Sequence, residues 1–515
     1  MGNSESKKTV VAIEIGNVNS GYAYGIGNYK DCHIYTATHG YGLPKDRVPT
    51  ALLLKNNAFD AFGYCAQDKF MSLTLQGDNL EYKYFNNLNI IERNGEYYIC
   101  DIQGTEMLAD DIYAIIIKYL YDSCMEQVAN NRHNNTTTIL ILCVSNESET
   151  IRDIIQSALE KIETKDNKRI KDNTRIVLDT DAAAAYCRYQ ALLMKRPTFI
   201  LVNLGGYTSK FCCQKVLSKG RYKELKDASA LPHGGETVTD AFLHELGKQI
   251  SNLDWNEFKN TNYYDYMYTR QSFDENKHKF SDHTESMIID LPLSVVKLFE
   301  TSKMASSSDG LAFTKDSKMI ITQEKMASLF SESLKEIVCK IETYEDVNEQ
   351  NDVLVFLAGG YSESSYVRDF IKKAVEPKRA LLVPDPSLAV MKGAVRMGFE
   401  PTMKSVFTYG FIRPDNPDDS PNFTLITRKG KSVFFQKIIS RRQILVNDTP
   451  FLTDLHIQDD ERHCSIILYK TRKDGSEHKD SDFIQVEEIS PPENGWNEIE
   501  TVEVKVTQII IHVSL

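Results

Sequence analysis

A strand that ends in a glycine-containing turn and resumes as a second strand occurs twice in this chain, and this repeat constrains the fold most. The first copy is TVVAIEIGNVNSGYAYG at residues 9–25, and the second is FILVNLGGYTSKFCCQKV at residues 199–216. Short apolar runs bounded by glycine or polar residues are typical of buried strands. The repeat therefore predicts two related α/β halves.

Other segments fit the same plan. A third apolar run, VLVFLA, ends at Gly359-Gly360 and leads into a predicted helix, and TILILCV at 138–144 predicts a further buried strand. The spacing of apolar residues predicts helices over 105–128 and 149–162. Strands that alternate with helices are typical of α/β architecture with largely parallel sheets.

The pattern changes after Pro401. The segment DNPDDSPN at 415–422 is a proline-rich acidic loop, and VEVKV at 502–506 alternates apolar with polar residues, as a strand does. We expect short strands and turns here, with no long helix. The sequence predicts a linker at 402–407 and an all-β, sandwich-like module at 408–515.

The chain is acidic, with 72 Asp and Glu against 60 Lys and Arg and a net charge of −12. This charge argues against nucleic-acid binding, because nucleic-acid-binding surfaces are basic. No run approaches 18 apolar residues, so no transmembrane helix is expected, and the N-terminus lacks the apolar core of a secretory signal. None of the ten cysteines forms a C-x-x-C pair, so we expect reduced thiols in a cytoplasmic protein rather than a zinc site.

Glycine turns at the ends of buried strands suit phosphate binding, because they expose backbone N–H groups without a Cβ atom in the way. At Gly359-Gly360 the following helix adds the positive end of its dipole. The chain has no G-x-x-x-x-G-K-[ST] sequence and no G-x-G-x-x-G at a strand-to-helix turn. P-loop and Rossmann sites are therefore disfavoured, while three glycine turns in this order favour another kind of phosphate site.

Several segments resemble, in the same order, the 70-kDa heat-shock protein family, whose nucleotide-binding domain has the actin-like ATPase (ribonuclease H-like) fold. The closest resemblance is to that family's divergent member-twelve branch. The segments are VVAIEIGNVNSGYAYG (10–25), VPTALLL (48–54), FGYCAQD (62–68), LDTDAAAAYCR (178–188), FILVNLGGYTSK (199–210), LPHGGET (231–237), FETSKMASSS (299–308), FLAGGYSESS (356–365) and PDPSLAVMKGAVRMG (384–398). Beyond them, SVFTYG at 405–410 resembles the branch's entry into its β-rich module.

The resemblance implies a two-lobed nucleotide-binding domain at 9–401, after a flexible N-terminal segment at 1–8. It implies that ATP or ADP binds between the lobes, with Mg²⁺ as a candidate ion. It also implies a substrate- or partner-binding role for the β-rich module at 408–515. The chain ends at Leu515 directly after a predicted strand, so we expect no helical lid over this module.

The family's site residues carry over position by position. Asp179 falls on a catalytic Glu, Glu14 on an Asp near the waters of the metal, and Thr208 on a catalytic position of the second turn. Glu14, Asn203 and Asp179 are the positions implied to face Mg²⁺ through waters. The implied nucleotide-binding positions are Gly16, Asn17, Val18, Gly205, Gly206, Tyr207, Thr208, Gly234, Gly235, Glu300, Lys303, Ser307, Gly359 and Gly360.

The chain departs from the family's pattern where the chemistry takes place. Asn203 replaces a metal-side Asp, and Tyr207 replaces a Gly. Gln67 replaces a catalytic Lys, although Lys69 is close by in the sequence. Phosphoryl transfer depends on positioning and charge stabilisation, and losing one such contact typically costs on the order of 10²–10³ in rate. We therefore expect slow or absent hydrolysis.

Nucleotide binding itself depends on the glycines, most of which remain. We expect ADP to bind better than ATP, because the Tyr207 side chain crowds the space for the β- and γ-phosphates. The alternative is a vestigial pocket that binds nothing. Ser145 stands where the family has a Pro that couples nucleotide state to the substrate module, which puts this coupling in doubt.

The leading hypothesis is a divergent, monomeric stress-response chaperone that regulates protein clients or signalling partners. One alternative is a non-catalytic adaptor or scaffold on the same fold, acting in the cytoplasm or at membranes. Another is a small-metabolite kinase of the same superfold. The closer match to heat-shock motifs and the lack of an identifiable substrate base argue against the kinase.

The N-terminal sequence MGNSESKK carries a second signal. It satisfies M-G-x-x-x-[ST], the pattern for myristoylation of Gly2, and Lys7-Lys8 follow. One myristoyl chain binds a membrane only marginally and reversibly, and two lysines add roughly 1 kcal/mol each at an anionic surface. The signal predicts partition between cytoplasm and membrane, whereas the alternative is a polar, disordered N-terminus.

The segment NYYDYMY at 262–268 is unusually rich in tyrosine. Two interpretations remain open from the sequence. The segment is either a packed helix beneath the adenosine lobe or a surface that binds a partner.

Overall fold

The computed structural model divides the chain into two units, which we describe separately. One unit comprises residues 1–217 and 223–399, and the other comprises residues 218–222 and 400–515. The structure describes residues 8–27, 32–37, 46–77, 81–130, 137–145, 148–162, 170–217, 222–250, 252–301, 310–314, 316–344, 353–376, 379–400, 402–404, 408–413, 423–428, 431–439, 444–446, 451–456, 466–471, 484–489, 499–506 and 511–514.

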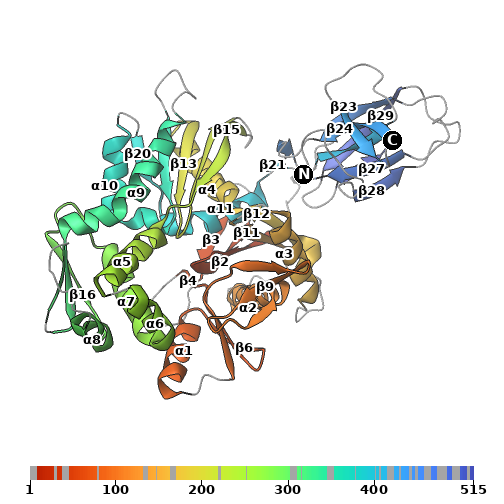
Figure 1. The fold of residues 1–515 in the computed structure, drawn as a ribbon. Coiled ribbons are helices and arrows are strands. Elements are labelled where there is room, and N and C mark those ends of the chain that lie inside the picture. Colours follow the sequence, from red (N-terminus) through yellow and green to blue (C-terminus); the bar gives the residue numbers. More distant parts are fainter. Residues whose placement is uncertain are drawn as a thin grey trace. The chain divides into compact units, whose positions relative to one another are not determined.

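The first unit contains two large sheets (Figure 1). The two sheets have the same strand order. The first sheet has the order β12-β11-β1-β2-β3, and β4 also pairs with β2. β1 and β2 form an antiparallel hairpin, whereas β11 and β12 lie parallel to β1. Its strands are β1 (Lys8–Ile15), β2 (Asn19–Gly27), β3 (His33–Thr36), β4 (Val48–Pro49), β11 (Thr137–Val144) and β12 (Thr174–Leu178).

The second sheet repeats this plan with the order β15-β14-β13-β19-β20. β13 and β14 form the antiparallel hairpin, and β19 and β20 continue in parallel. Its strands are β13 (Thr198–Leu204), β14 (Ser209–Val216), β15 (Tyr222–Leu231), β19 (Leu354–Ala358) and β20 (Arg379–Leu382). The prediction of two α/β halves built on one plan is confirmed.

Helices occupy corresponding places in the two halves. One helix precedes the first parallel strand, one connects the two parallel strands, and one follows the second. These are α2 (Ala109–Asn130), α3 (Glu149–Lys161) and α4 (Asp179–Leu193) in the first half, and α9 (Gln323–Glu342), α10 (Ser365–Ala374) and α11 (Ala389–Phe399) in the second. Hydroxyl groups cap three of them, since Ser148, Thr322 and Ser364 accept hydrogen bonds from the first turns of α3, α9 and α10.

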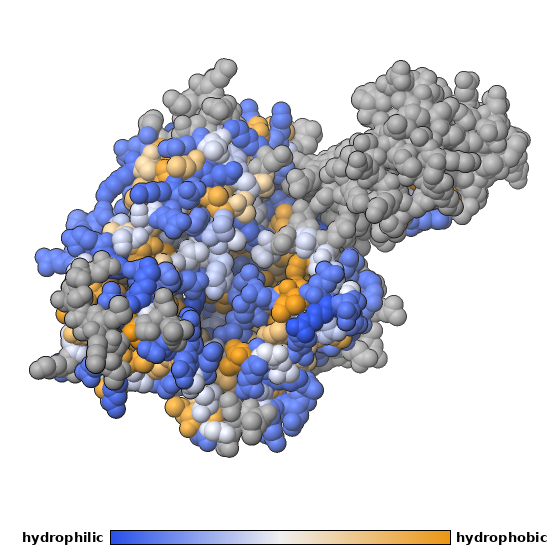
Figure 2. Space-filling model, viewed as in Figure 1, coloured by the Kyte–Doolittle hydropathy of each residue, from blue (hydrophilic) through white to orange (hydrophobic). Residues whose placement is uncertain are grey.

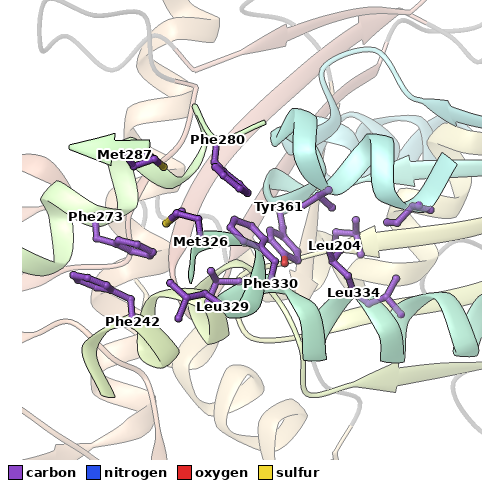
Figure 3. Packing of buried hydrophobic residues seen from close by; sticks show 14 of the residues in the cluster. Leu204, Phe242, Phe273, Phe280, Met287, Met326, Leu329, Phe330, Leu334 and Tyr361 are labelled. Carbon is purple, nitrogen blue, oxygen red and sulfur yellow. The ribbon is translucent and has the colours of Figure 1, made fainter. Parts of the chain in front are cut away.

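The central strands β1 and β13 are buried on both faces, which explains their continuous apolar sequence. Val11 and Ile13 of β1 pack in a core with α2 and α3, whereas Val10 and Ala12 point the other way. In β13, Leu204 and its neighbours on the same face join a core with α5, α9 and α10. Figure 3 shows part of this core, including the aromatic rings that stack around Phe330 and Tyr361.

The last helix of each half, α4 or α11, packs on the sheet of the other half. Both helices are labelled between the two sheets in Figure 1. α11 contacts β1, β2 and β11, and α4 contacts β13 and β14. The two helices also pack on each other, where a Cβ atom on Gly393 would lie 1.7 Å from the carbonyl oxygen of Ala182. This exchange of helices makes one unit from the two halves.

Further elements extend each half. The first half adds α1 (Tyr64–Gln76), β5 (Leu52–Lys55), β6 (Ala58–Phe62), β7 (Tyr82–Phe85), β8 (Ile90–Arg93), β9 (Glu96–Cys100), β10 (Glu106–Leu108) and the 3₁₀ turn η1 (Ile170–Asn173). The second adds α5 (Gly235–Ile250), α6 (Asn252–Thr261), α7 (Tyr263–Lys277), α8 (Leu293–Thr301), β16 (Ser286–Asp290), β17 (Leu311–Phe313), β18 (Lys318–Thr322), η4 (Gly360–Glu363) and η5 (Pro386–Leu388). In the part of the chain that the structure describes, no helix is long and apolar enough to cross a membrane.

Two predicted boundaries differ from the structure. The helix predicted from residue 105 begins at Ala109, because Glu106–Leu108 instead pairs with β9 as strand β10. Thr402–Lys404, predicted as linker, forms strand β21, which pairs with β25 (Ile444–Val446). In both cases the local structure is decided by pairing with another strand. The spacing of apolar residues within the segment does not reveal this pairing.

Every element described in the second unit after residue 401 is a strand. The strand orders are β23-β24-β22-β27-β28 in one sheet, β26-β29-β30 in another, and the pair β21-β25. The strands are β21 (Thr402–Lys404), β22 (Thr408–Arg413), β23 (Phe423–Arg428), β24 (Lys431–Ile439), β25 (Ile444–Val446), β26 (Phe451–His456), β27 (Ile466–Thr471), β28 (Ile484–Ile489), β29 (Ile499–Val506) and β30 (Ile511–Ser514).

The contact between α4 and α11 gives a direct test of this architecture. We expect Gly393→Ala to lower the free energy of unfolding by about 3 kcal/mol or more, because the new methyl group meets backbone that cannot move aside. Gly360→Ala is the matched control, since nothing lies within 4 Å of a Cβ atom there. Urea unfolding of both variants measures the difference, and equal stabilities would contradict the close packing of the two helices.

Candidate functional site

The first glycine turn links β1 to β2 and is held by Thr50. The Thr50 backbone N–H donates to Val18 O at 2.9 Å, and its hydroxyl donates to Gly16 O at 2.6 Å. The hydroxyl oxygens of Thr50 and Ser20 are also 2.7 Å apart. These contacts fix the turn, so its shape does not depend on a bound molecule.

The second turn links β13 to β14 and packs against the start of α5. Gly205 N–H donates to Thr208 O at 2.9 Å, which closes the turn. The carbonyl groups of Gly205 and Gly206 accept from the N–H groups of Gly235 and Glu236 at 3.1 and 2.8 Å. A Cβ atom on Gly234 would lie 2.2 Å from Gly206 O, so only glycine fits there. By contrast, the N–H groups of Gly206 and Tyr207 donate to no described backbone carbonyl.

The third turn follows β19, and its two glycines have different roles. Gly359 has a φ of +84°, and a Cβ atom there would lie 2.2 Å from Leu204 O and 2.8 Å from Asn203 Oδ1. At Gly360 the same space is open to 4 Å. Leu204 and Tyr361 lie close together in the core of the second half (Figure 3), so this core positions the second and third turns together.

The first and second turns face each other. A Cβ atom on Gly206 would lie 2.5 Å from Val18 Cγ2, which places the Val18 side chain directly against the second turn. Next to this contact is a cavity of about 630 Å³, whose lining includes Asn17, Val18, Gln67 and Tyr207. The structure thus brings together the turns at Gly16, Gly205 and Gly359, with Gly234 and Gly235 beside them.

Two ion pairs lie where the central strands end. Arg47 Nη2 donates to Glu14 Oε1 at 2.6 Å, and Lys210 Nζ donates to Asp179 Oδ2 at 2.5 Å. Lys210 also donates to Ser145 O at 2.6 Å. All four charged side chains are largely buried, with at most 19% of any one exposed. We call Glu14, Arg47, Asp179 and Lys210 the charge cluster.

The charge cluster is balanced, with two acids and two bases, and Asn203 beside it is neutral. Asn203 and Lys210 are opposite each other on β13 and β14, so they share one face of the hairpin. Burial raises the pKa of Glu14, although the Arg47 guanidinium opposes this shift. Glu14 Oε2 is buried and has no hydrogen-bond partner among the described residues.

These residues do not fit Mg²⁺. The ion needs near-octahedral oxygen coordination and binds proteins through carboxylates and waters. Here each carboxylate already binds a cationic side chain, and Asn203 brings no charge. Of the four carboxylate oxygens of Glu14 and Asp179, Glu14 Oε2 alone has no partner among the described residues. Within the described ranges, no three His, Cys, Asp or Glu side chains are grouped to hold a metal ion. The predicted metal positions Glu14, Asn203 and Asp179 therefore lie near one another, but Arg47 and Lys210 already pair with their two carboxylates.

Other predicted residues lie elsewhere or beyond the described residues. Lys69 pairs with Asp60 at 2.7 Å and is 45% exposed, so it is engaged away from the glycine turns. Gln67 lines the cavity and hydrogen-bonds the Tyr84 hydroxyl. Glu300 is exposed near the end of α8. Lys303, Ser307 and Gly2 lie outside the described residues.

Sequence reasoning missed the basic residues of the site. Arg47 and Lys210 are not among the site residues that the sequence predicts. A lysine within a largely buried strand, as at Lys210, is nevertheless a usable signal for a buried ion pair. Arg270 on α7 was missed as well, and it pairs with Glu236 and hydrogen-bonds the Tyr207 hydroxyl. Tyr207 lines the cavity and is 38% exposed.

The tyrosine-rich segment is helix α7, and its first tyrosine is packed. Tyr263 accepts a hydrogen bond from Asn86 Nδ2 at 2.7 Å and contacts the Phe70 ring edge-on at 6.2 Å. At the other end of the helix, Lys277 donates to Gly235 O at 2.8 Å. These contacts favour the packed-helix interpretation, and they join α7 to both the first half and the start of α5.

The described structure is a mixed α/β protein whose two like halves meet at glycine turns. No family model matches the chain. Heat shock 70 kDa protein 12A of Mus musculus is 21% identical over 488 residues, covering 78% of this chain and 71% of the relative. Heat shock 70 kDa protein 12A of Homo sapiens is 20% identical over 493 residues, covering 79% and 72%. The resemblance to the member-twelve branch of the 70-kDa heat-shock proteins is confirmed.

The Arg47–Glu14 pair can be tested by a double-mutant cycle. We expect Arg47→Met to lower the free energy of unfolding by about 2–3 kcal/mol, because it leaves a buried carboxylate unpaired. Adding Glu14→Gln should restore more than half of the loss, since the orphaned charge disappears. Urea unfolding of the wild type, both single variants and the double variant gives the coupling. Strictly additive losses would show that the two side chains do not interact.

Proposed function

We propose that the chain is a divergent protein of the 70-kDa heat-shock type, with an actin-like two-lobed domain that binds ATP or ADP. The observation that carries this proposal is the convergence of three glycine turns at the ends of β1, β13 and β19. Similarity to heat shock 70 kDa protein 12A supports the same conclusion. We further propose that nucleotide state regulates partner binding by the β-rich module at 408–515.

Backbone groups at the turns support nucleotide binding. Gly206 and Tyr207 keep N–H groups that pair with no described carbonyl, and such groups suit phosphate oxygens. Gly360 leaves open space where any side chain would intrude. These features depend on main-chain geometry, so they tolerate the replaced side chains around them.

The side chains argue against rapid hydrolysis. Asp179, at the catalytic acid position, is held by Lys210, and Asn203 cannot supply the missing negative charge. Gln67 brings no positive charge to the phosphates. Because phosphoryl transfer relies on such charges, we propose slow or absent turnover.

One observation favours a non-catalytic adaptor as the second candidate. The Val18 side chain already lies against Gly206, between the two turns that would hold the phosphates. An adaptor on the same fold would have no need to open this contact. Attachment of myristate at Gly2, contact with membranes and a cytoplasmic location stay predictions.

Calorimetric titration of the full chain with ADP and with ATP, in the presence of Mg²⁺, tests the proposal. We expect saturable binding of both nucleotides, tighter for ADP, and no product in a single-turnover hydrolysis assay. Gly360→Leu should keep its thermal stability and lose binding, because its side chain enters the open space beside the turn.

The outcomes separate the candidates. Absence of binding by either nucleotide contradicts the proposal and favours the adaptor. Hydrolysis at the rate of an ordinary heat-shock chaperone contradicts the proposed loss of turnover. Equal binding by wild type and Gly360→Leu would place the nucleotide elsewhere in the protein.

A further inference from the structure

We infer that the charge cluster occupies the place that the family resemblance assigns to Mg²⁺, so that nucleotide binds at the facing glycine turns, here called the cleft, without a divalent ion and Lys210 contacts the phosphates directly. This inference rests on the proposed function. It concerns which groups of the protein contact the phosphates.

The position of Lys210 is the first argument. It is opposite Asn203 on the hairpin that carries the second glycine turn. Its ammonium group reaches the first half, where it donates to Asp179 Oδ2 at 2.5 Å and to Ser145 O at 2.6 Å. A cation therefore already lies among the groups that the family resemblance assigns to the metal.

The number of donors is the second argument. An ammonium group has three N–H donors, and within the described part of the chain two of those on Lys210 are used. One donor remains for a phosphate oxygen. A lysine serves phosphate as a point charge, so Lys210 can donate to a phosphate oxygen without an ion between them.

Arg47 supplies the second cation. Its Nη2 lies 3.7 Å from the place of a Cβ atom on Gly16, so the guanidinium is beside the first turn. It donates to Glu14 Oε1 and to Asn19 O in the first half, and to Ser387 O at 3.1 Å in the second. Both cations thus link the two halves where the turns face each other.

Electrostatics then disfavours a divalent ion. Glu14 and Asp179 bring two negative charges, which Arg47 and Lys210 cancel. A Mg²⁺ ion at these carboxylates would lie beside two positive side chains, Arg47 and Lys210. The four side chains together carry little net negative charge to attract the ion, and repulsion between like charges is costly away from bulk water. To bind there, the ion would have to displace Lys210 from Asp179.

The experiment compares ADP binding to the full chain in excess EDTA and in excess Mg²⁺. We expect the Kd for ADP to change by less than about tenfold between the two conditions. A Mn²⁺ titration followed by electron paramagnetic resonance measures the bound ion. We expect the protein to bind no Mn²⁺, so that all bound Mn²⁺ is accounted for by free ADP.

A paired substitution tests the role of Lys210. Lys210→Met alone leaves Asp179 buried and unpaired, so it risks misfolding. Lys210→Met/Asp179→Asn keeps the cluster balanced, and we expect it to weaken ADP binding in EDTA by about tenfold or more, the loss of one charge-assisted hydrogen bond. The control is Lys226→Met on β15, whose ammonium group donates to Thr343 O outside the cleft. It should bind ADP as the wild type does.

Each result has one meaning. Binding of ADP in Mg²⁺ but not in EDTA overturns the inference and leaves the proposed nucleotide site standing. Wild-type affinity of the paired variant in EDTA overturns the assignment of Lys210. Absence of ADP binding in both conditions overturns the inference and the proposed function together.

Discussion

The balance of charge between the two halves is the constraint on which the rest of this site depends. Two acids at the ends of buried elements would repel each other and resist burial if they were left alone. Arg47 and Lys210 solve this problem within the chain, since each binds one acid and also reaches a backbone carbonyl. The two halves are therefore joined beside the glycine turns by hydrogen bonds and ion pairs of these two cations.

The main-chain features of the site are held separately from its charged side chains. The glycine turns are fixed by their own contacts, with Thr50 behind the first and α5 behind the second. Their geometry does not depend on whether Asn203 or Gln67 carries a charge. The shape of the proposed nucleotide site therefore does not rest on the charges that hydrolysis would need.

Much of the fold could be predicted from the sequence, because its signals are local. Apolar runs broken by glycine predicted the central strands and the repeat, and the turn at Gly359-Gly360 was found in the same way. The charge cluster could not be predicted, because its partners are separated by 33 residues for Glu14 and Arg47 and by 31 for Asp179 and Lys210. Proximity in sequence even favoured Lys69, which binds Asp60 on an exposed surface instead. Only the packing of distant elements decides which charges meet.

Lys210 also suggests how nucleotide binding would affect the rest of the first unit. Its bond to Ser145 O joins the second hairpin to the end of β11, at the position where the family resemblance expects a coupling Pro. A phosphate that drew Lys210 toward the glycine turn would loosen this bond. The proposed regulation thus has a physical starting point in the first unit.

The claim that ADP binds at the glycine turns without a divalent ion is tested most directly by an anomalous diffraction map. The map would come from crystals of the full chain grown with ADP and Mn²⁺. We expect ADP density between the glycine turns and a phosphate oxygen within hydrogen-bonding distance of Lys210 Nζ. We expect no manganese peak beside Asp179 or Asn203. A manganese peak coordinated between the phosphates and Asp179 or Glu14, with Lys210 displaced, would contradict this claim.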